Sequence, residues 1–89
     1  TQSAVLGVIK AGAVELADRQ IRVNGIVAIR PREERIENWT TRRTPWGRAA
    51  IADEIADAAR YLSSPDAAII TGELLKLDGG RSSLAGVLD

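Results

Sequence analysis

The first third of the chain carries two apolar segments with different periodicities. Between Ser3 and Ala17 the apolar residues recur at helical spacing and cover nearly the whole circumference, which is typical of a helix covered on more than one side. After the polar break at 18–20 come four β-branched residues that are nearly continuous, as in a strand buried on both faces of a parallel sheet: Ile21, Val23, Ile26 and Val27. The pattern therefore predicts an αβ unit over residues 1–28.

Two glycines, Gly7 and Gly12, lie inside the predicted helix. Each would cost about 1 kcal/mol relative to alanine in a solvated helix, so their presence favours close approach of another element. Two interpretations stay open: the helix packs on the core of its own chain, or it packs against a second chain. The helical pattern begins at once after Thr1, and we expect this abrupt start in a chain cut from something longer.

A second αβ unit follows in the latter half of the chain. Apolar residues at i, i+4 and i+7 predict an amphipathic helix from Ile51 to Leu62, which Ser63-Ser64-Pro65 ends. Gly72 permits a turn, residues 74–77 read as a strand, and Asp78-Gly79-Gly80 stops that strand. The order αβαβ predicts two parallel strands joined by a right-handed crossover. Since two parallel strands do not form a stable sheet alone, we expect further strands from a missing segment or a partner chain.

Residues 29–48 break the pattern and are expected to form an arginine-rich loop within a single partial domain that spans residues 1–89, with one short helix possible at 32–39. Six arginines against three glutamates leave a local charge of +3. Arginine beside tryptophan can hold a phosphate or stack on a base. The alternative is a solvated loop with Arg–Glu pairs inside the chain. The candidate anion-binding residues are Arg30, Arg32, Arg42, Arg43 and Trp39.

Composition narrows the possible chemistry. The chain has neither cysteine nor histidine, which excludes disulfides, thiolate metal sites and cysteine nucleophiles and removes the commonest general base, so we expect no metal site. Twelve basic residues balance twelve acidic ones, so we expect no nucleic-acid partner. No run of 18 apolar residues and no signal-peptide pattern is visible, so we expect a cytoplasmic protein with no membrane partner.

Several motifs in order resemble the C-terminal third of the short-chain dehydrogenases/reductases (SDRs). They are Ile21–Asn24 (IRVN), Gly47-Arg48 before an acidic-opening helix, Ile70-Thr71-Gly72, and Asp78-Gly79-Gly80. The resemblance implies an α/β fold in which this chain supplies the last two parallel strands, with their helices, of a doubly wound Rossmann-type sheet.

The resemblance also implies that several family positions are altered here. The family lysine, which lowers the pKa of the catalytic tyrosine and holds the nicotinamide ribose, falls on Gln2. The Pro-Gly pair beside the nicotinamide falls on Ala28 and Ile29, and the carboxamide-binding threonine falls near Glu33. The catalytic tyrosine and the glycine-rich cofactor loop would lie before Thr1. We therefore expect no catalytic residue in this chain and degenerate cofactor positions at Gln2, Ala28 and Ile29.

Three functional hypotheses follow. The chain is a non-catalytic SDR subunit or fragment that binds no cofactor alone and supports an active NAD(P)-dependent subunit acting on a hydroxyl or carbonyl substrate. Alternatively, it is the C-terminal part of an active NAD(P)-dependent SDR enzyme, or the arginine-rich loop makes it a binding module for an anion such as a CoA phosphate. The resemblance implies association with an SDR-type subunit or a second copy through the helix Ser3–Ala17 and the C-terminal strand and tail. The sequence does not identify the substrate or decide between NAD and NADP.

Overall fold

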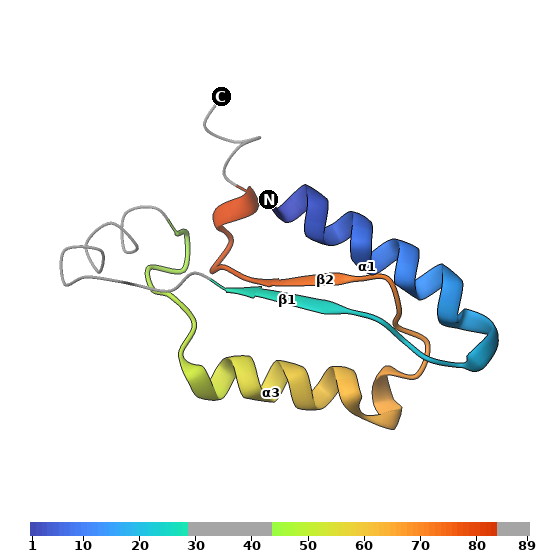
Figure 1. Ribbon diagram of the computed structural model, residues 1–89. Coiled ribbons are helices and arrows are strands. Elements are labelled where there is room, and N and C mark those ends of the chain that lie inside the picture. Colours follow the sequence, from blue (N-terminus) through green and yellow to red (C-terminus); the bar gives the residue numbers. More distant parts are fainter. Residues whose placement is uncertain (29–43, 84–89) are drawn as a thin grey trace.

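The computed structural model describes residues 1–28 and 44–83, which form an α/β arrangement (Figure 1). The predicted short helix at 32–39 lies outside these residues. The chain order is an α-helix, a 3-10 turn, a strand, a second α-helix, another 3-10 turn, a second strand and a last 3-10 turn. Their bounds are α1 Gln2–Leu16, η1 Ala17–Arg19, β1 Gly25–Ala28, α3 Ala52–Ser63, η2 Pro65–Ala67, β2 Leu74–Leu77 and η3 Arg81–Ser83.

The two strands are parallel, as the αβαβ order predicts. Gly25 pairs with Leu74 and Ala28 with Leu77, so the four residues of β1 lie in register with the four of β2. Helices α1 and α3 lie on opposite sides of this sheet, and both begin at the end where the strands finish (Figure 1). This arrangement confirms the predicted α/β class.

Helix α1 packs on the sheet through small residues. An added β-carbon on Gly12 would lie 3.6 Å from a methyl group of Val23, and one on Gly72 would lie 3.5 Å from the β-carbon of Ala13. Ile9 and Ala13 are buried, so α1 packs on the sheet through the face that carries them. A methyl group at Gly12 would make ordinary van der Waals contact with Val23, so the expected close approach at this glycine is not required by packing within the described residues.

In the described residues α1 is covered on one side, so the further cover that its apolar circumference predicts would have to come from outside them. Val8 is 74% exposed and Val14 is 80% exposed, and nothing lies within 4 Å of a β-carbon added to Gly7. The apolar residues of these 68 positions that are buried are Ile9, Ala13 and Ala67. The outer face of α1 is therefore an apolar surface without a covering element in the described part of the chain.

The first strand is shorter than predicted, because the residues from Ile21 to Asn24 do not join the ladder. They are fixed by other hydrogen bonds: the N–H of Val23 donates to the Thr71 hydroxyl over 3.1 Å, and the N–H of Gly72 donates to the Val23 carbonyl over 2.7 Å. The strand is also half-buried rather than buried on both faces.

Asn24 joins the two segments that lead into the strands. Its side-chain amide donates to the carbonyl of Ile70 over 2.9 Å, and its side-chain oxygen accepts from the N–H of Glu73 over 3.0 Å. Both bonds connect residues more than 45 positions apart in the chain. Asn24 therefore sets the relative position of β1 and β2 at their amino ends.

The second helix and the turns agree with the sequence-based expectations. Helix α3 ends at Ser63, and Ser64 leads into the turn that begins at Pro65. Gly72, Gly79 and Gly80 all have positive φ, which glycine adopts without the steric cost that a β-carbon brings. None of the described helices has the length and apolar character needed to cross a membrane.

Candidate functional site

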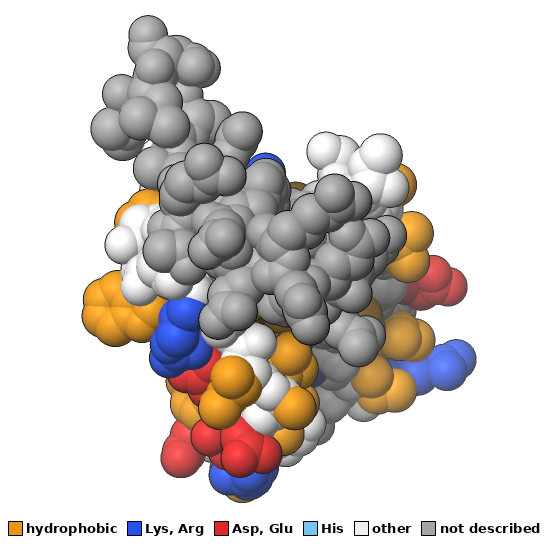
Figure 2. All heavy atoms as spheres, turned by 90° about the vertical axis from the view of Figure 1, so that its left-hand side faces the viewer, with side chains coloured by type: hydrophobic (Ala, Val, Ile, Leu, Met, Phe, Trp, Pro, Cys, Tyr) orange, Lys and Arg blue, Asp and Glu red, His pale blue; other side chains and the backbone are white. Residues whose placement is uncertain are grey.

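The candidate site lies at the carboxyl ends of β1 and β2, where ligands bind in open α/β sheets. The elements that meet there are the first turn of α1, the turn at 44–48, the start of α3 and the Asp78–Gly80 turn (Figure 1). Figure 2 looks onto this end and shows hydrophobic side chains beside acidic and basic ones.

Gln2 and Ala28 lie at the same level of the fold. Ile9 lies over Gly25, since its Cδ1 would be 2.5 Å from a β-carbon at that position. From this contact, seven residues back along the helix and three residues forward along the strand each cover about 10 Å in the same direction. Gln2 is exposed in the first turn of α1, and Ala28 ends β1. Gln2 and Ala28, two of the three positions at which the sequence predicts a degenerate cofactor site, therefore lie at one end of the sheet.

The first turn of α1 is capped by Thr1, whose hydroxyl accepts a hydrogen bond from the N–H of Ala4 over 3.2 Å. This bond satisfies one of the N–H groups that a helix start leaves without a partner. The first turn holds no acidic residue. A side chain at position 2 therefore projects from a fixed helical start.

The remaining predicted site residues lie outside the described residues. They are Ile29, Arg30, Arg32, Glu33, Trp39, Arg42 and Arg43. Arg48, at the end of the arginine-rich segment, is described, and its guanidinium forms an ion pair inside the chain. For this residue the structure agrees with the interpretation of the segment as a loop with Arg–Glu pairs.

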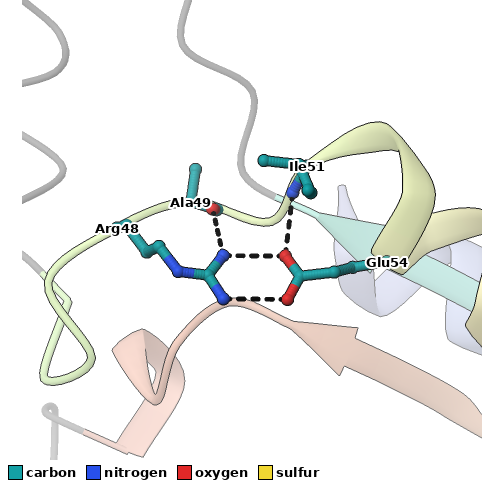
Figure 3. Close-up of polar contacts among 4 residues, drawn as sticks. All are labelled: Arg48, Ala49, Ile51 and Glu54. Atoms are coloured by element: carbon teal, nitrogen blue, oxygen red, sulfur yellow. Dashed lines mark hydrogen bonds and ion pairs between the residues drawn. The ribbon is translucent and has the colours of Figure 1, made fainter.

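Arg48 and Glu54 form a two-pronged ion pair at the start of α3 (Figure 3). Nη1 of Arg48 lies 2.7 Å from Oε1 of Glu54, and Nη2 lies 2.8 Å from Oε2. Nη1 also donates to the carbonyl of Ala49 over 3.1 Å, while the N–H of Ile51 donates to Oε1 over 3.0 Å. These contacts fix the turn at 44–48 to the first turn of α3.

The ion pair changes the acidity of both partners. The hydrogen bonds from Arg48, followed by the N–H of Ile51, lower the pKa of Glu54 from 4.5 to about 2. The hydrogen bond to Glu54 raises the pKa of Arg48. Both side chains remain exposed to solvent, so water strongly screens the attraction between their charges. The pair therefore holds the local backbone in place but is not a buried ion pair.

The Asp78–Gly80 turn is held by its own carboxylate. Oδ1 of Asp78 accepts from the N–H of Gly80 over 3.0 Å, and Oδ2 accepts from the N–H of Ser82 over 3.1 Å and from its hydroxyl over 2.5 Å. These bonds, the one from the Ser82 hydroxyl first, lower the pKa of Asp78. The carboxylate of Asp78 therefore accepts its hydrogen bonds from the turn itself.

A pocket of about 170 Å³ lies between the 44–48 turn, the start of α3 and the end of β2. Sequence reasoning did not single out this pocket, because its walls come from three segments that the chain order separates. The spacing of Arg48 and Glu54 is also not a helical contact spacing, so their pairing had no periodic signal. The residues that line the pocket are Trp46, Arg48, Ala50, Glu54, Leu77 and Gly79.

The described residues contain no cluster of three or more acidic or metal-binding side chains that could hold a metal ion. Among the residues that the structure describes, this end of the fold offers hydrogen bonding by Gln2, apolar contact in the pocket, and the paired charges of Arg48 and Glu54.

Comparison with known proteins relates this geometry to a family. Residues 1–82 match the family described as Enoyl-(Acyl carrier protein) reductase. The chain is 38% identical to an A-factor type gamma-butyrolactone 1'-reductase (1S-forming) of Streptomyces virginiae, over 94% of this chain and 37% of the relative. It is 41% identical to a galactitol 2-dehydrogenase (L-tagatose-forming) of Cereibacter sphaeroides, over 90% of this chain and 35% of the relative.

Solved structures agree with this relationship. The fold matches that of a 3-ketoacyl-(acyl-carrier-protein) reductase from Brucella melitensis complexed with NADH, with a TM-score of 0.78 and 37% identity, over 90% of this chain and 34% of that chain. It also matches a short chain dehydrogenase family protein from Francisella tularensis, with a TM-score of 0.76 and 25% identity, over 91% and 41% of the two chains. This likeness confirms the predicted Rossmann-type architecture. The chain spans about a third of the length of the curated relatives it matches.

Proposed function

Because the chain belongs to the short-chain dehydrogenase/reductase family, we propose that it is part of an SDR-type oxidoreductase assembly in which it does not itself carry out hydride transfer. In this proposal the chain supplies scaffold and contact surface, and an active NAD(P)-dependent subunit acts on the hydroxyl or carbonyl substrate. The reductase and dehydrogenase names of its relatives support the oxidoreductase setting.

The main support for a non-catalytic role is the neutral side chain of Gln2. In the family, the residue aligned with Gln2 is a lysine whose positive charge stabilises the phenolate of the catalytic tyrosine. An amide can hydrogen-bond a ribose hydroxyl, but it brings no charge to lower the pKa of a phenol. Gln2 is exposed in the first turn of α1, and this helix begins at the end where the strands finish (Figure 1).

The end of β1 supports the same proposal. Ala28 stands at the family's proline position, and the next residue, Ile29, stands where a glycine allows the backbone to approach the nicotinamide. A branched side chain at that point would occupy the space of the cofactor. The residue near the family's carboxamide-binding threonine is Glu33, whose negative charge offers no evident contact for a carboxamide oxygen.

The exposed face of α1 supports association with another subunit. Val8 and Val14 are largely exposed, and Gly7 lies beside open space. Glycine and alanine on this face would let a second helix approach closely, and β-branched side chains lose little rotamer entropy when they pack. The two strands also need neighbours for a stable sheet. We propose that α1 and the C-terminal strand contact an SDR-type subunit or a second copy.

An active NAD(P)-dependent enzyme is the second candidate, which the enzymatic names of the relatives favour. The two candidates differ in turnover. The test uses the purified natural protein with galactitol and NAD⁺, and with acetoacetyl-CoA and NADPH, two probes suggested by the relatives' names. We expect no turnover from the natural protein or from its Gln2→Lys variant, because restoring one charge does not restore the Ala28–Ile29 region. Measurable turnover by either protein would favour the second candidate.

A further inference from the structure

Trp46 combines a fixed backbone with an exposed indole. Its N–H donates to the carbonyl of Gly79 over 3.0 Å, and the N–H of Gly47 donates to both the carbonyl and the hydroxyl of Thr44, each over 3.0 Å. Thr44 is only 5% exposed, so the turn is anchored in the fold. Yet Trp46 is 73% exposed. A large aromatic side chain usually buries much of its surface, so a tryptophan held in the open offers a ring face for contact.

The position of Trp46 depends on the glycine opposite it. A β-carbon added to Gly79 would lie 3.1 Å from the β-carbon of Trp46 and 3.2 Å from the carbonyl oxygen of Arg48. A side chain at position 79 would require the 44–48 turn to move slightly away from the end of β2. The result is a pocket that has Trp46 on one side and Leu77 and Ala50 among its other walls.

The size of the pocket limits its ligand. Its volume is about 170 Å³, and an apolar cavity of about 150 Å³ holds a benzene-sized molecule. Trp46, Ala50 and Leu77 supply apolar surface, and an indole favours offset stacking with another ring. The pocket thus has room for a single six-membered ring.

The charge at the rim limits the ligand further. The guanidinium of Arg48 is occupied on both prongs by Glu54 and also donates to the Ala49 carbonyl. The positive charge of Arg48 and the negative charge of Glu54 offset each other, so neither an anion nor a cation meets an uncompensated charge at this rim. The rim therefore favours a neutral ligand.

We propose that the Trp46 pocket, formed by Trp46, Ala50, Leu77 and Gly79 with the Arg48–Glu54 pair at its rim, binds a small neutral molecule carrying one planar ring. The ring stacks on the indole of Trp46, and its edge contacts Leu77 and Ala50. This binding goes beyond the proposed function and does not depend on hydride transfer, so each can fail while the other stands.

The test measures the affinity of the purified natural protein for benzyl alcohol, a neutral planar ring, by ligand-observed NMR. Cyclohexylmethanol and benzoate serve as probes of ring planarity and of charge. We expect benzyl alcohol to bind more tightly than either of the other two. Absence of benzyl alcohol binding would overturn the proposal, and equal or tighter binding of benzoate would overturn the choice of a neutral ligand.

Two substitutions locate the site. Trp46→Leu removes the stacking face and Ala50→Leu fills the pocket, and each should weaken benzyl alcohol binding roughly two- to tenfold. Tyr61→Leu is the matched control, because Tyr61 is an exposed aromatic residue of α3 that does not line the pocket. Circular dichroism verifies that all variants are folded. Unchanged affinity in both pocket variants, or an equal loss in Tyr61→Leu, would overturn the proposal.

Discussion

The δ-methyl group of Ile9 lies so close to Gly25 that a β-carbon at position 25 would be 2.5 Å from it and 3.1 Å from Leu74. This contact joins the buried face of α1 to the beginning of β1. It explains why a glycine opens a strand that is otherwise built from larger residues.

Enlarging Gly25 should destabilise the protein in steps. Gly25→Ala requires the tip of Ile9 to rotate away, and we expect a loss of about 1 kcal/mol, while Gly25→Val also meets Leu74 and should lose about 2–3 kcal/mol. Urea denaturation measures both. Gly7→Ala is a control for the single subunit only, because within the chain its added methyl group meets nothing and should stabilise α1 by about 0.5–1 kcal/mol. Equal stability of the two Gly25 variants would contradict the packing of α1 on β1.

Substitutions at two glycines of the candidate site distinguish the cost of backbone strain from the cost of steric crowding. Gly47 and Gly79 both have positive φ, but a β-carbon meets open space at Gly47 and three neighbours at Gly79. We expect Gly47→Ala to cost about 1–2 kcal/mol from the left-handed backbone alone. Gly79→Ala should cost more than this. Thermal denaturation compares the two variants, and a Gly79→Ala midpoint equal to or above that of Gly47→Ala would contradict the described turn.

The Arg48–Glu54 pair predicts a dependence of stability on pH. The pKa of Glu54 is lowered in the folded protein to about 2, from 4.5. Such a carboxylate contributes stability that is present above about pH 4.5 and is lost as the pH falls toward 2. We expect Glu54→Gln to lower the melting temperature at neutral pH, with the difference from the natural protein vanishing near pH 2.

The control for this measurement is Asp57→Asn on the same helix. Asp57 forms an exposed ion pair with Arg60 at 2.8 Å, which is a single contact between helical neighbours. Its removal should change the melting temperature less than Glu54→Gln does, since exposed i,i+3 pairs contribute little. A Glu54→Gln effect that does not change with pH would show that the loss is not electrostatic.

The outer face of α1 predicts assembly. We expect the purified natural protein to have a native mass of at least two subunits, and Val8→Glu to shift it toward the single subunit, because a carboxylate would be buried in the contact. Ala56→Glu is the control, since Ala56 is exposed on α3, which lies on the other side of the sheet from α1 (Figure 1). An unchanged native mass in Val8→Glu would exclude this face as the contact.

Local patterns predicted the elements of this fold, whereas contacts between distant segments could not be predicted. The helical period placed α1 and α3 to within a residue or two of Gln2–Leu16 and Ala52–Ser63. The apolar run at 21–28 predicted a longer strand than Gly25–Ala28. Apolar character does not show that the side chains of Asn24 and Thr71 form hydrogen bonds between the two segments before the strand ladder begins.

The sequence predicted the parts of the candidate site that depend on single residues, but not the parts that depend on contacts between two residues. Gln2 and Ala28 follow from the order of motifs along the chain, and the structure places both at one end of the sheet. The Trp46 pocket depends on Gly79 lying opposite a turn more than 30 residues earlier, and Arg48 meets Glu54 through a turn rather than along a helix face. Neither relationship has a periodic signal in the sequence.

The most direct test of the non-catalytic role is the transfer of deuterium from the 4-position of deuterated NADPH to acetoacetyl-CoA, with the purified natural protein in excess over substrate. Mass spectrometry of the product detects even a single slow turnover. The account predicts no deuterium in the product for the natural protein or for Gln2→Lys. Deuterated product above the level without protein would contradict it and would identify an active short-chain dehydrogenase/reductase.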